Sequence, residues 1–158
     1  MSNYYPAPIV KDGISYNSSV SFYYCQKFAN VTAAQRAIRA QKNPSMAAYF
    51  GRRANFNPRQ DWEDPGVKDA AMCEALRLKF DQHPQLQEQL LATHGYELVE
   101  MNPTDPYWSI GKHGNGQNML GKLLMDLRTR YKSQRSAEIT TPLDPVNYVA
   151  SRILKPSD

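Results

Sequence analysis

The strongest constraint on the fold is an apolar stripe in the last third of the chain. Its members recur at the three- and four-residue spacings of one helical face: Leu120, Leu123, Leu124, Leu127 and Tyr131. The spacing predicts an amphipathic helix over about residues 118–132. Because that face is strongly apolar, it has to pack against other elements of a folded core.

Caps, prolines and glycines mark further helices upstream. Asn43-Pro44 and Asp64-Pro65 each pair a capping residue with a proline at the first helical position, where its fixed φ suits the helix. Thr32 is another cap, and Pro84 opens a helix that Gly95 can end. Together these signals predict four helices, over residues 33–41, 44–51, 65–81 and 84–95.

Strand signals are few. A short strand is expected at Ala7–Val10, before a turn at Asp12-Gly13, and another at Tyr96–Met101. The aromatic-rich segment Val20–Phe28 fits a strand or a helix by its period alone. The chain is therefore expected to form one helix-rich α+β domain with few short strands and long functional loops.

The helical pattern weakens after Ser133. Three prolines in this last stretch, at positions 142, 145 and 156, indicate an extended tail. One short helix is expected near Val146–Leu154.

Composition narrows the functional classes. The 158 residues suffice for one domain with a sizeable core, and no apolar run approaches the ~18 residues that cross a membrane. No signal peptide is visible after Met1, so no membrane association is expected. Cys25 and Cys73 make neither a disulfide framework nor a zinc-binding pattern, which favours a reducing, cytoplasmic compartment and no metal. The net charge of +4 favours an anionic partner: a nucleotide, a sugar phosphate or a nucleic acid.

Residues 105–121 have the composition of a ligand-binding loop. They combine aromatic, acidic and glycine residues directly before the amphipathic helix, whose first N–H groups can bind an anion. Trp108 offers a surface on which a ring can stack, and Asp105 could act there as a general acid or base. Asn118 could hold a ligand hydroxyl or cap the helix.

Lys27 lies among aromatic residues. Desolvation there would lower the pKa of its amine and make it a usable nucleophile. The alternative is an ordinary lysine whose stem packs on the rings while its ammonium stays in water.

Two further clusters have both a binding and a structural interpretation. Gly51-Arg52-Arg53, with Arg59 nearby, could bind phosphate through guanidinium forks or could complete the end of a helix. Asp61-Trp62 could place an acid beside a stacking ring, or could be a loop aspartate next to a core tryptophan.

Eight short motifs, in order along residues 2–132, resemble the NADAR family of YbiA-like N-glycosidases. They are Gln26-Lys27-Phe28, Gly51-Arg52, Arg59-Gln-Asp61-Trp62, Ala75-Leu-Arg-Leu-Lys-Phe80, Leu90-Leu-Ala-Thr93, Leu98-Val-Glu100, Asp105-Pro-Tyr-Trp108 and Gly116-Gln-Asn-Met-Leu-Gly121. The resemblance implies a small α+β domain over residues 1–132, a C-terminal extension over 133–158, and cleavage of N-glycosidic bonds without a cofactor or metal. Substrates in the family are early riboflavin intermediates or ADP-ribosylated guanine of nucleic acids.

The resemblance also implies roles for individual residues. Lys27 would be the nucleophile, assisted by Asp61 or Asp105. The ligand-binding residues would be Gly51, Arg52, Trp62, Tyr107, Trp108, Gly116 and Asn118.

One pair departs from the family pattern. The family's Glu-His pair, seven and six residues before the lysine, falls here on Val20 and Ser21, and a valine can be neither acid nor base. Two main hypotheses follow: an N-glycosidase acting on an ADP-ribosyl or ribosyl-phosphate N-glycoside, or a catalytically weakened protein that binds or sequesters an ADP-ribose-like nucleotide. A nucleic-acid-binding module is the third.

Overall fold

The computed structural model describes residues 2–53 and 55–140. Within them a two-stranded antiparallel hairpin precedes six helices. The elements are β1 (Ile9–Lys11), β2 (Ile14–Tyr16), α1 (Ser19–Lys27), α2 (Thr32–Arg39), α3 (Pro44–Arg53), α4 (Val67–Gln82), α5 (Pro84–Ala92) and α6 (Met119–Thr140). This arrangement confirms the predicted helix-rich α+β class.

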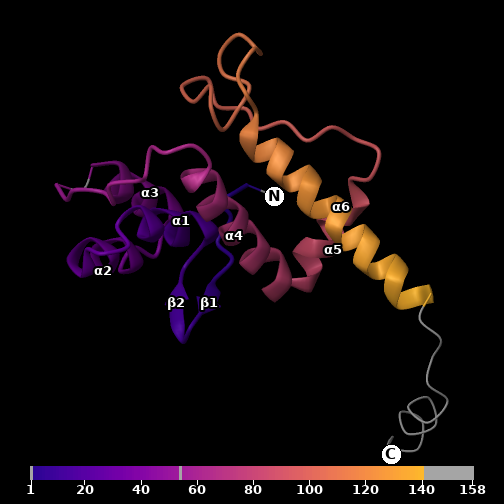
Figure 1. The fold of residues 1–158 in the computed structure, drawn as a ribbon, viewed down its shortest axis with the longest axis horizontal. Coiled ribbons are helices and arrows are strands. Elements are labelled where there is room, and N and C mark those ends of the chain that lie inside the picture. The colour runs from indigo at the N-terminus through magenta and orange to yellow at the C-terminus, as the bar shows by residue number, and fades with distance from the viewer. Residues whose placement is uncertain (1, 54, 141–158) are drawn as a thin grey trace, which may run out of the picture.

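Helix α4 lies at the centre of the molecule. Figure 1 shows α1, α2 and α3 on one side of it and α5 and α6 on the other, and α4 contacts α1, α5, α6 and β1. The fully buried part of the core includes Leu76 and Phe80 of α4, together with Phe22, Phe28, Ile38, Ile9 and Leu90 from the elements around it. The apolar stripe of α6 is also buried at Leu120, Leu124, Leu127 and Tyr131.

Local signals explain the two elements whose prediction was incomplete. Asp12 and Gly13 both have positive φ, 51° and 75°, the conformation that a two-residue hairpin turn requires, and so β2 pairs with β1. The β2 strand was not predicted. The aromatic-rich segment is helical up to Lys27, and the Ser18 side chain caps α1 by accepting a hydrogen bond from the Ser21 N–H.

Two predicted helix boundaries are wrong. Helix α4 begins at Val67 rather than Pro65, because Gly66 takes a left-handed conformation, with φ 81°, in front of it. Helix α6 extends to Thr140, well beyond the expected end near residue 132. The helix expected at Val146–Leu154 lies outside the described residues.

The expected strand at Tyr96–Met101 is also absent. The segment is not part of a sheet: Glu100 N–H donates to the Asn118 side chain, and Leu98 C=O accepts from that same side chain. An asparagine thus replaces the partner strand. Glu100 C=O accepts one further bond, from Ile110 N–H.

The start of α6 packs tightly on this extended segment. A methyl group at Gly121 would lie 2.1 Å from the Leu98 carbonyl oxygen and within 2.6 Å of both Asn118 side-chain polar atoms.

We therefore expect Gly121→Ala to lower the free energy of unfolding by about 1–3 kcal/mol, measured by urea denaturation. The neighbouring exposed Lys122→Ala is the control, with an expected change within about 0.5 kcal/mol. Stabilisation by the Gly121 variant, as in an open helix position, would contradict this packing.

Candidate active site

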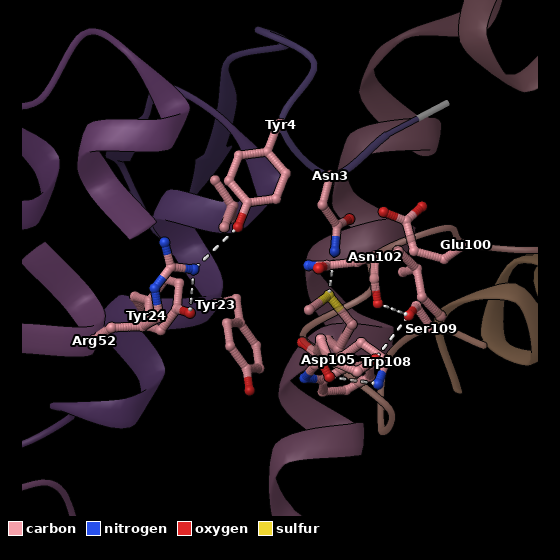
Figure 2. Close-up of a pocket in the computed structure, with 13 residues that line it drawn as sticks. Asn3, Tyr4, Tyr23, Tyr24, Arg52, Glu100, Asn102, Asp105, Trp108 and Ser109 are labelled. Carbon is pink, nitrogen blue, oxygen red and sulfur yellow. Dashed lines mark hydrogen bonds between the residues drawn. The ribbon is translucent and has the colours of Figure 1, made fainter. Parts of the chain in front are cut away.

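A cavity opens between the α1–α3 side of the molecule and the loop that precedes α6. The empty space in it is about 510 Å³, a figure that includes the open mouth. Thirteen residues line it: Asn3, Tyr4, Val20, Tyr23, Tyr24, Arg52, Met72, Glu100, Asn102, Asp105, Trp108, Ser109 and Leu120. Figure 2 shows Arg52 and the tyrosines on one side and the acidic loop residues on the other.

One end of the cavity is cationic. The Arg52 guanidinium donates to the hydroxyl of Tyr4 at 3.2 Å and to that of Tyr24 at 3.5 Å. The Tyr4 hydrogen bond raises the pKa of Arg52, so its charge is permanent. Neither tyrosine neutralises that charge, which leaves the guanidinium suited to a phosphate.

The opposite end is acidic. Asp105 Oδ1 accepts from the N–H groups of Tyr107 and Trp108 at 3.2 and 3.0 Å, which fixes the turn that carries the tryptophan. None of the described residues donates a hydrogen bond to the Glu100 carboxylate. Ser109 Oγ lies 2.7 Å from the carbonyl oxygens of both Asn102 and Asp105 and ties the two parts of the loop together.

An aromatic cluster connects the two ends. The Tyr23 ring meets Trp108 edge to face, with centroids 5.8 Å apart, and lies 5.2 Å from the buried Trp62. Burial raises the pKa of Tyr23, so the phenol stays neutral. Edge-to-face packing of this kind holds Trp108 in one orientation for a ligand ring to stack on.

Part of the cavity lining is apolar. Val20, from the first turn of α1, contributes to it together with Met72 and Leu120. Val20 is only 3% exposed, so little room is left beside it. The position that the resemblance assigns to a glutamate thus faces the cavity, with an aliphatic side chain in place of the acid.

Three of the predicted site residues line this cavity: Arg52, Asp105 and Trp108. The other seven do not, although several support the walls. Trp62 packs behind Tyr23, and Gly51 lets Tyr24 approach α3, since a methyl group there would lie 2.2 Å from the Tyr24 ring.

Lys27 lies outside the cavity lining. Its ammonium donates to the Gly51 carbonyl at 3.3 Å and lies 5.4 Å from the centre of the Phe28 ring. Burial lowers the pKa of Lys27, and the charge of Glu63 opposes that shift. Lys27 is therefore partly desolvated, as its aromatic surroundings predicted. Its contact residue, Gly51, directly precedes Arg52 in the sequence.

Asp61 and Tyr107 have other partners. Asp61 forms a two-pronged ion pair with Arg59, at 2.5 and 2.6 Å, on a separate surface hollow, and this bond lowers the pKa of Asp61. The Tyr107 hydroxyl donates to Asp69 at 2.6 Å, which raises the pKa of Tyr107 to about 12. The Lys68 ammonium lies 4.2 Å from the centre of the Tyr107 ring.

Gly116 and Asn118 hold the loop closed. A methyl group at Gly116 would lie 2.3 Å from the Ser109 carbonyl oxygen. Asn118 is buried, has a left-handed φ of 51°, and clips the segment that carries Glu100 to the start of α6. Asn118 was expected to hold a ligand hydroxyl or to cap the helix. Its side chain instead bonds Glu100 and Leu98, while its carbonyl oxygen accepts a hydrogen bond from Lys122 N–H at the start of α6.

Several cavity residues were missed by sequence reasoning. Glu100 ends one of the family-like motifs, and Tyr23 and Tyr24 belong to the aromatic-rich segment, so a sequence pattern pointed to all three. Asn3 and Tyr4 had none, because long-range contacts bring the N-terminal segment to the cavity. Over the described ranges, no group of three or more His, Cys, Asp or Glu residues could hold a metal, and no helix is long and apolar enough to cross a membrane.

Comparison with known proteins identifies the family. The sequence model of the NADAR domain matches residues 1–132. The chain belongs to the NADAR family. The chain is 42% identical over 127 residues to N-glycosidase YbiA of Escherichia coli K12, covering 80% of this chain and 78% of YbiA. The solved NMR structure of E. coli YbiA superposes with a TM-score of 0.76 at 40% identity, over 85% of this chain and 78% of that one.

Part of two larger proteins is also similar to this chain. The chloroplastic riboflavin biosynthesis protein PYRR of Arabidopsis thaliana is 44% identical over 110 residues, which are 66% of this chain but only 18% of PYRR. Riboflavin biosynthesis protein VVA0006 of Vibrio vulnificus is 35% identical over 128 residues, covering 81% of this chain and 34% of that protein. The predicted family membership is thus confirmed.

Two substitutions test the side-chain hydrogen bonds of Asn118 to Leu98 and Glu100. Asn118→Gly keeps the left-handed backbone and removes two side-chain hydrogen bonds, which we expect to cost about 2 kcal/mol of unfolding free energy. Asn118→Ala adds left-handed strain of about 1 kcal/mol. Urea denaturation measures both. Wild-type stability in both variants would show that the side chain is dispensable for the loop.

Proposed function

We propose that this NADAR protein is an N-glycosidase that acts on an ADP-ribosyl or ribosyl-phosphate N-glycoside. The observation that carries the proposal is the polarity of the cavity, with Arg52 at one end, Glu100 and Asp105 at the other, and Trp108 on the wall. A phosphate would bind Arg52, the sugar would lie toward the carboxylates, and the base would stack on Trp108. ADP-ribosylated guanine and phosphorylated riboflavin intermediates both fit this description.

Cleavage of an N-glycosidic bond needs two kinds of assistance. Positive charge develops at the sugar C1 and must be stabilised, while the departing base must receive a proton. Glu100 is suited to one of these tasks because none of the described residues donates a hydrogen bond to its carboxylate. Asp105 can assist through Oδ2, since its Oδ1 already accepts two backbone N–H groups.

Lys27 is the candidate nucleophile in this proposal. Its neutral amine would attack C1, the C1–N bond to the base would break, and the base would leave with a proton from a carboxylic acid of the cavity, giving a glycosylamine on Lys27. The attacking nitrogen would return a proton to that carboxylate, which would then protonate the ring oxygen as the C1–O bond of the sugar ring opens, giving a protonated Schiff base. Water would hydrolyse this Schiff base, which releases the sugar and regenerates the amine. Lys27 would first have to leave the Gly51 carbonyl, and its lowered pKa increases the fraction of neutral amine at a given pH.

The second candidate function is a catalytically weakened NADAR protein that binds or sequesters an ADP-ribose-like nucleotide. The specific observation in its favour is the apolar cavity lining at Val20, where the family resemblance expects a glutamate. A ligand would bind through Arg52 and Trp108 and be released unchanged. Both functions use the same cavity, so turnover is what separates them.

Ligand binding is tested by two neighbouring arginines. Arg52→Ala removes the cation of the cavity and should weaken ADP-ribose binding about tenfold or more, because a charge-assisted hydrogen bond is lost. Arg53→Ala is the matched control, since Arg53 packs 5.0 Å from the Tyr49 ring and does not line the cavity. Calorimetric titration with ADP-ribose measures the affinity of both variants. An equal loss of affinity in the two would place the anion site elsewhere.

Turnover is tested with ADP-ribosylated guanosine and with phosphorylated riboflavin intermediates, by mass spectrometry of the released base. We expect Lys27→Ala to abolish release and borohydride to trap a covalent adduct on the wild-type protein but not on this variant. Because the amine must be neutral, the rate should rise with pH through the lowered pKa of Lys27. The exposed Lys42→Ala is the control.

Two outcomes would redirect the assignment. Release without any trapped adduct, retained in Lys27→Ala and lost in Glu100→Gln, would replace the covalent route by carboxylate-assisted hydrolysis. Stoichiometric retention of intact ligand would overturn the N-glycosidase proposal in favour of sequestration.

A further inference from the structure

Helix α4 carries a lysine with no exposed surface. Lys79 is 0% exposed, and its ammonium lies 5.4 and 5.7 Å from the ring centres of Phe80 and Tyr5. Burial lowers the pKa of Lys79 to about 8. An aliphatic side chain of similar length would avoid this desolvation cost, so core packing alone does not account for an amine here.

The Lys79 ammonium binds the N-terminal segment, residues 2–5. Its Nζ donates to the Ser2 carbonyl oxygen at 2.8 Å, and the same oxygen accepts from Tyr5 N–H at 3.0 Å. This segment belongs to no helix or strand, so no ladder of backbone bonds holds it in place. Its position depends on bonds to side chains from elsewhere in the fold.

The N-terminal segment forms part of the cavity wall. Asn3 and Tyr4 line the cavity, and Figure 2 shows both above the space between Arg52 and the acidic loop. Asn3 Nδ2 donates to Met72 Sδ at 2.9 Å, and Ser19 Oγ donates to the Asn3 carbonyl at 3.2 Å. The Tyr4 hydroxyl meets Arg52. A displacement of this segment would therefore open the wall and remove one partner of Arg52.

We propose that Lys79 is a positioning residue for the cavity: its hydrogen bond to the Ser2 carbonyl fixes the N-terminal segment so that Asn3 and Tyr4 complete the wall. Lys79 does not itself line the cavity. Its effect on ligand binding rests on the proposed function, whereas its effect on the segment does not.

The test compares Lys79→Met with the wild type. Methionine keeps most of the buried volume but donates no hydrogen bond to Ser2. We expect the amides of Tyr5 and Ala7, which both donate to carbonyl oxygens of the segment, to exchange with deuterium at least about tenfold faster. Amides in α1 should keep their protection. Affinity for ADP-ribose should fall while the unfolding midpoint stays at or above that of the wild type.

The exposed Lys122→Met on α6 is the control and should change none of these quantities. Unchanged exchange at Tyr5 and Ala7 in a folded Lys79→Met variant would overturn the proposal. If that variant does not fold, Lys79→Leu, which also donates no hydrogen bond to Ser2, takes its place: faster exchange confined to the two amides supports the role, and wild-type exchange overturns it. Failure of the wild type to bind ADP-ribose would count against the proposed function only, since the exchange measurement needs no ligand.

Discussion

The cavity depends on the way the loop before α6 closes on itself. Successive N–H groups from Gly116 to Leu120 donate to carbonyls of residues 106–110, and the Asn118 side chain adds bonds to Leu98 and Glu100. Ile110 N–H then returns to the Glu100 carbonyl. Because the backbone N–H and C=O groups of the loop bond one another in this way, the carboxylates and Trp108 are held in place without a supporting sheet. The absence of a methyl group at Gly116 makes the close approach sterically feasible.

This loop faces a wall of quite different chemistry. Arg52 and the tyrosines come from α1, α3 and the N-terminal segment, whereas the acids come from the loop, so opposite charges meet across a space walled by aromatic rings. The proposed function places in this cavity a ligand with an anionic end, a ring and a sugar that develops positive charge.

Local patterns predicted most of the helices, because caps, prolines and apolar spacing act within a few residues. The α1 segment could not be assigned in this way, since aromatic residues suit both periods, and Tyr96–Met101 was misassigned because its partner is a side chain rather than a strand. The same limit applies to the site. Arg52, Asp105 and Trp108 stood out by composition, but Asn3 and Tyr4 reach the cavity only through tertiary contacts with α3 and α4.

We propose that the ligand binds in the cavity with the two charged ends. A crystal structure of the protein with ADP-ribose tests this most directly. We expect a phosphate within hydrogen-bond distance of the Arg52 guanidinium, a ring stacked on Trp108, and a ribose beside Glu100 and Asp105. ADP-ribose bound instead in the hollow beside Arg59 and Asp61, with the cavity empty, would contradict it.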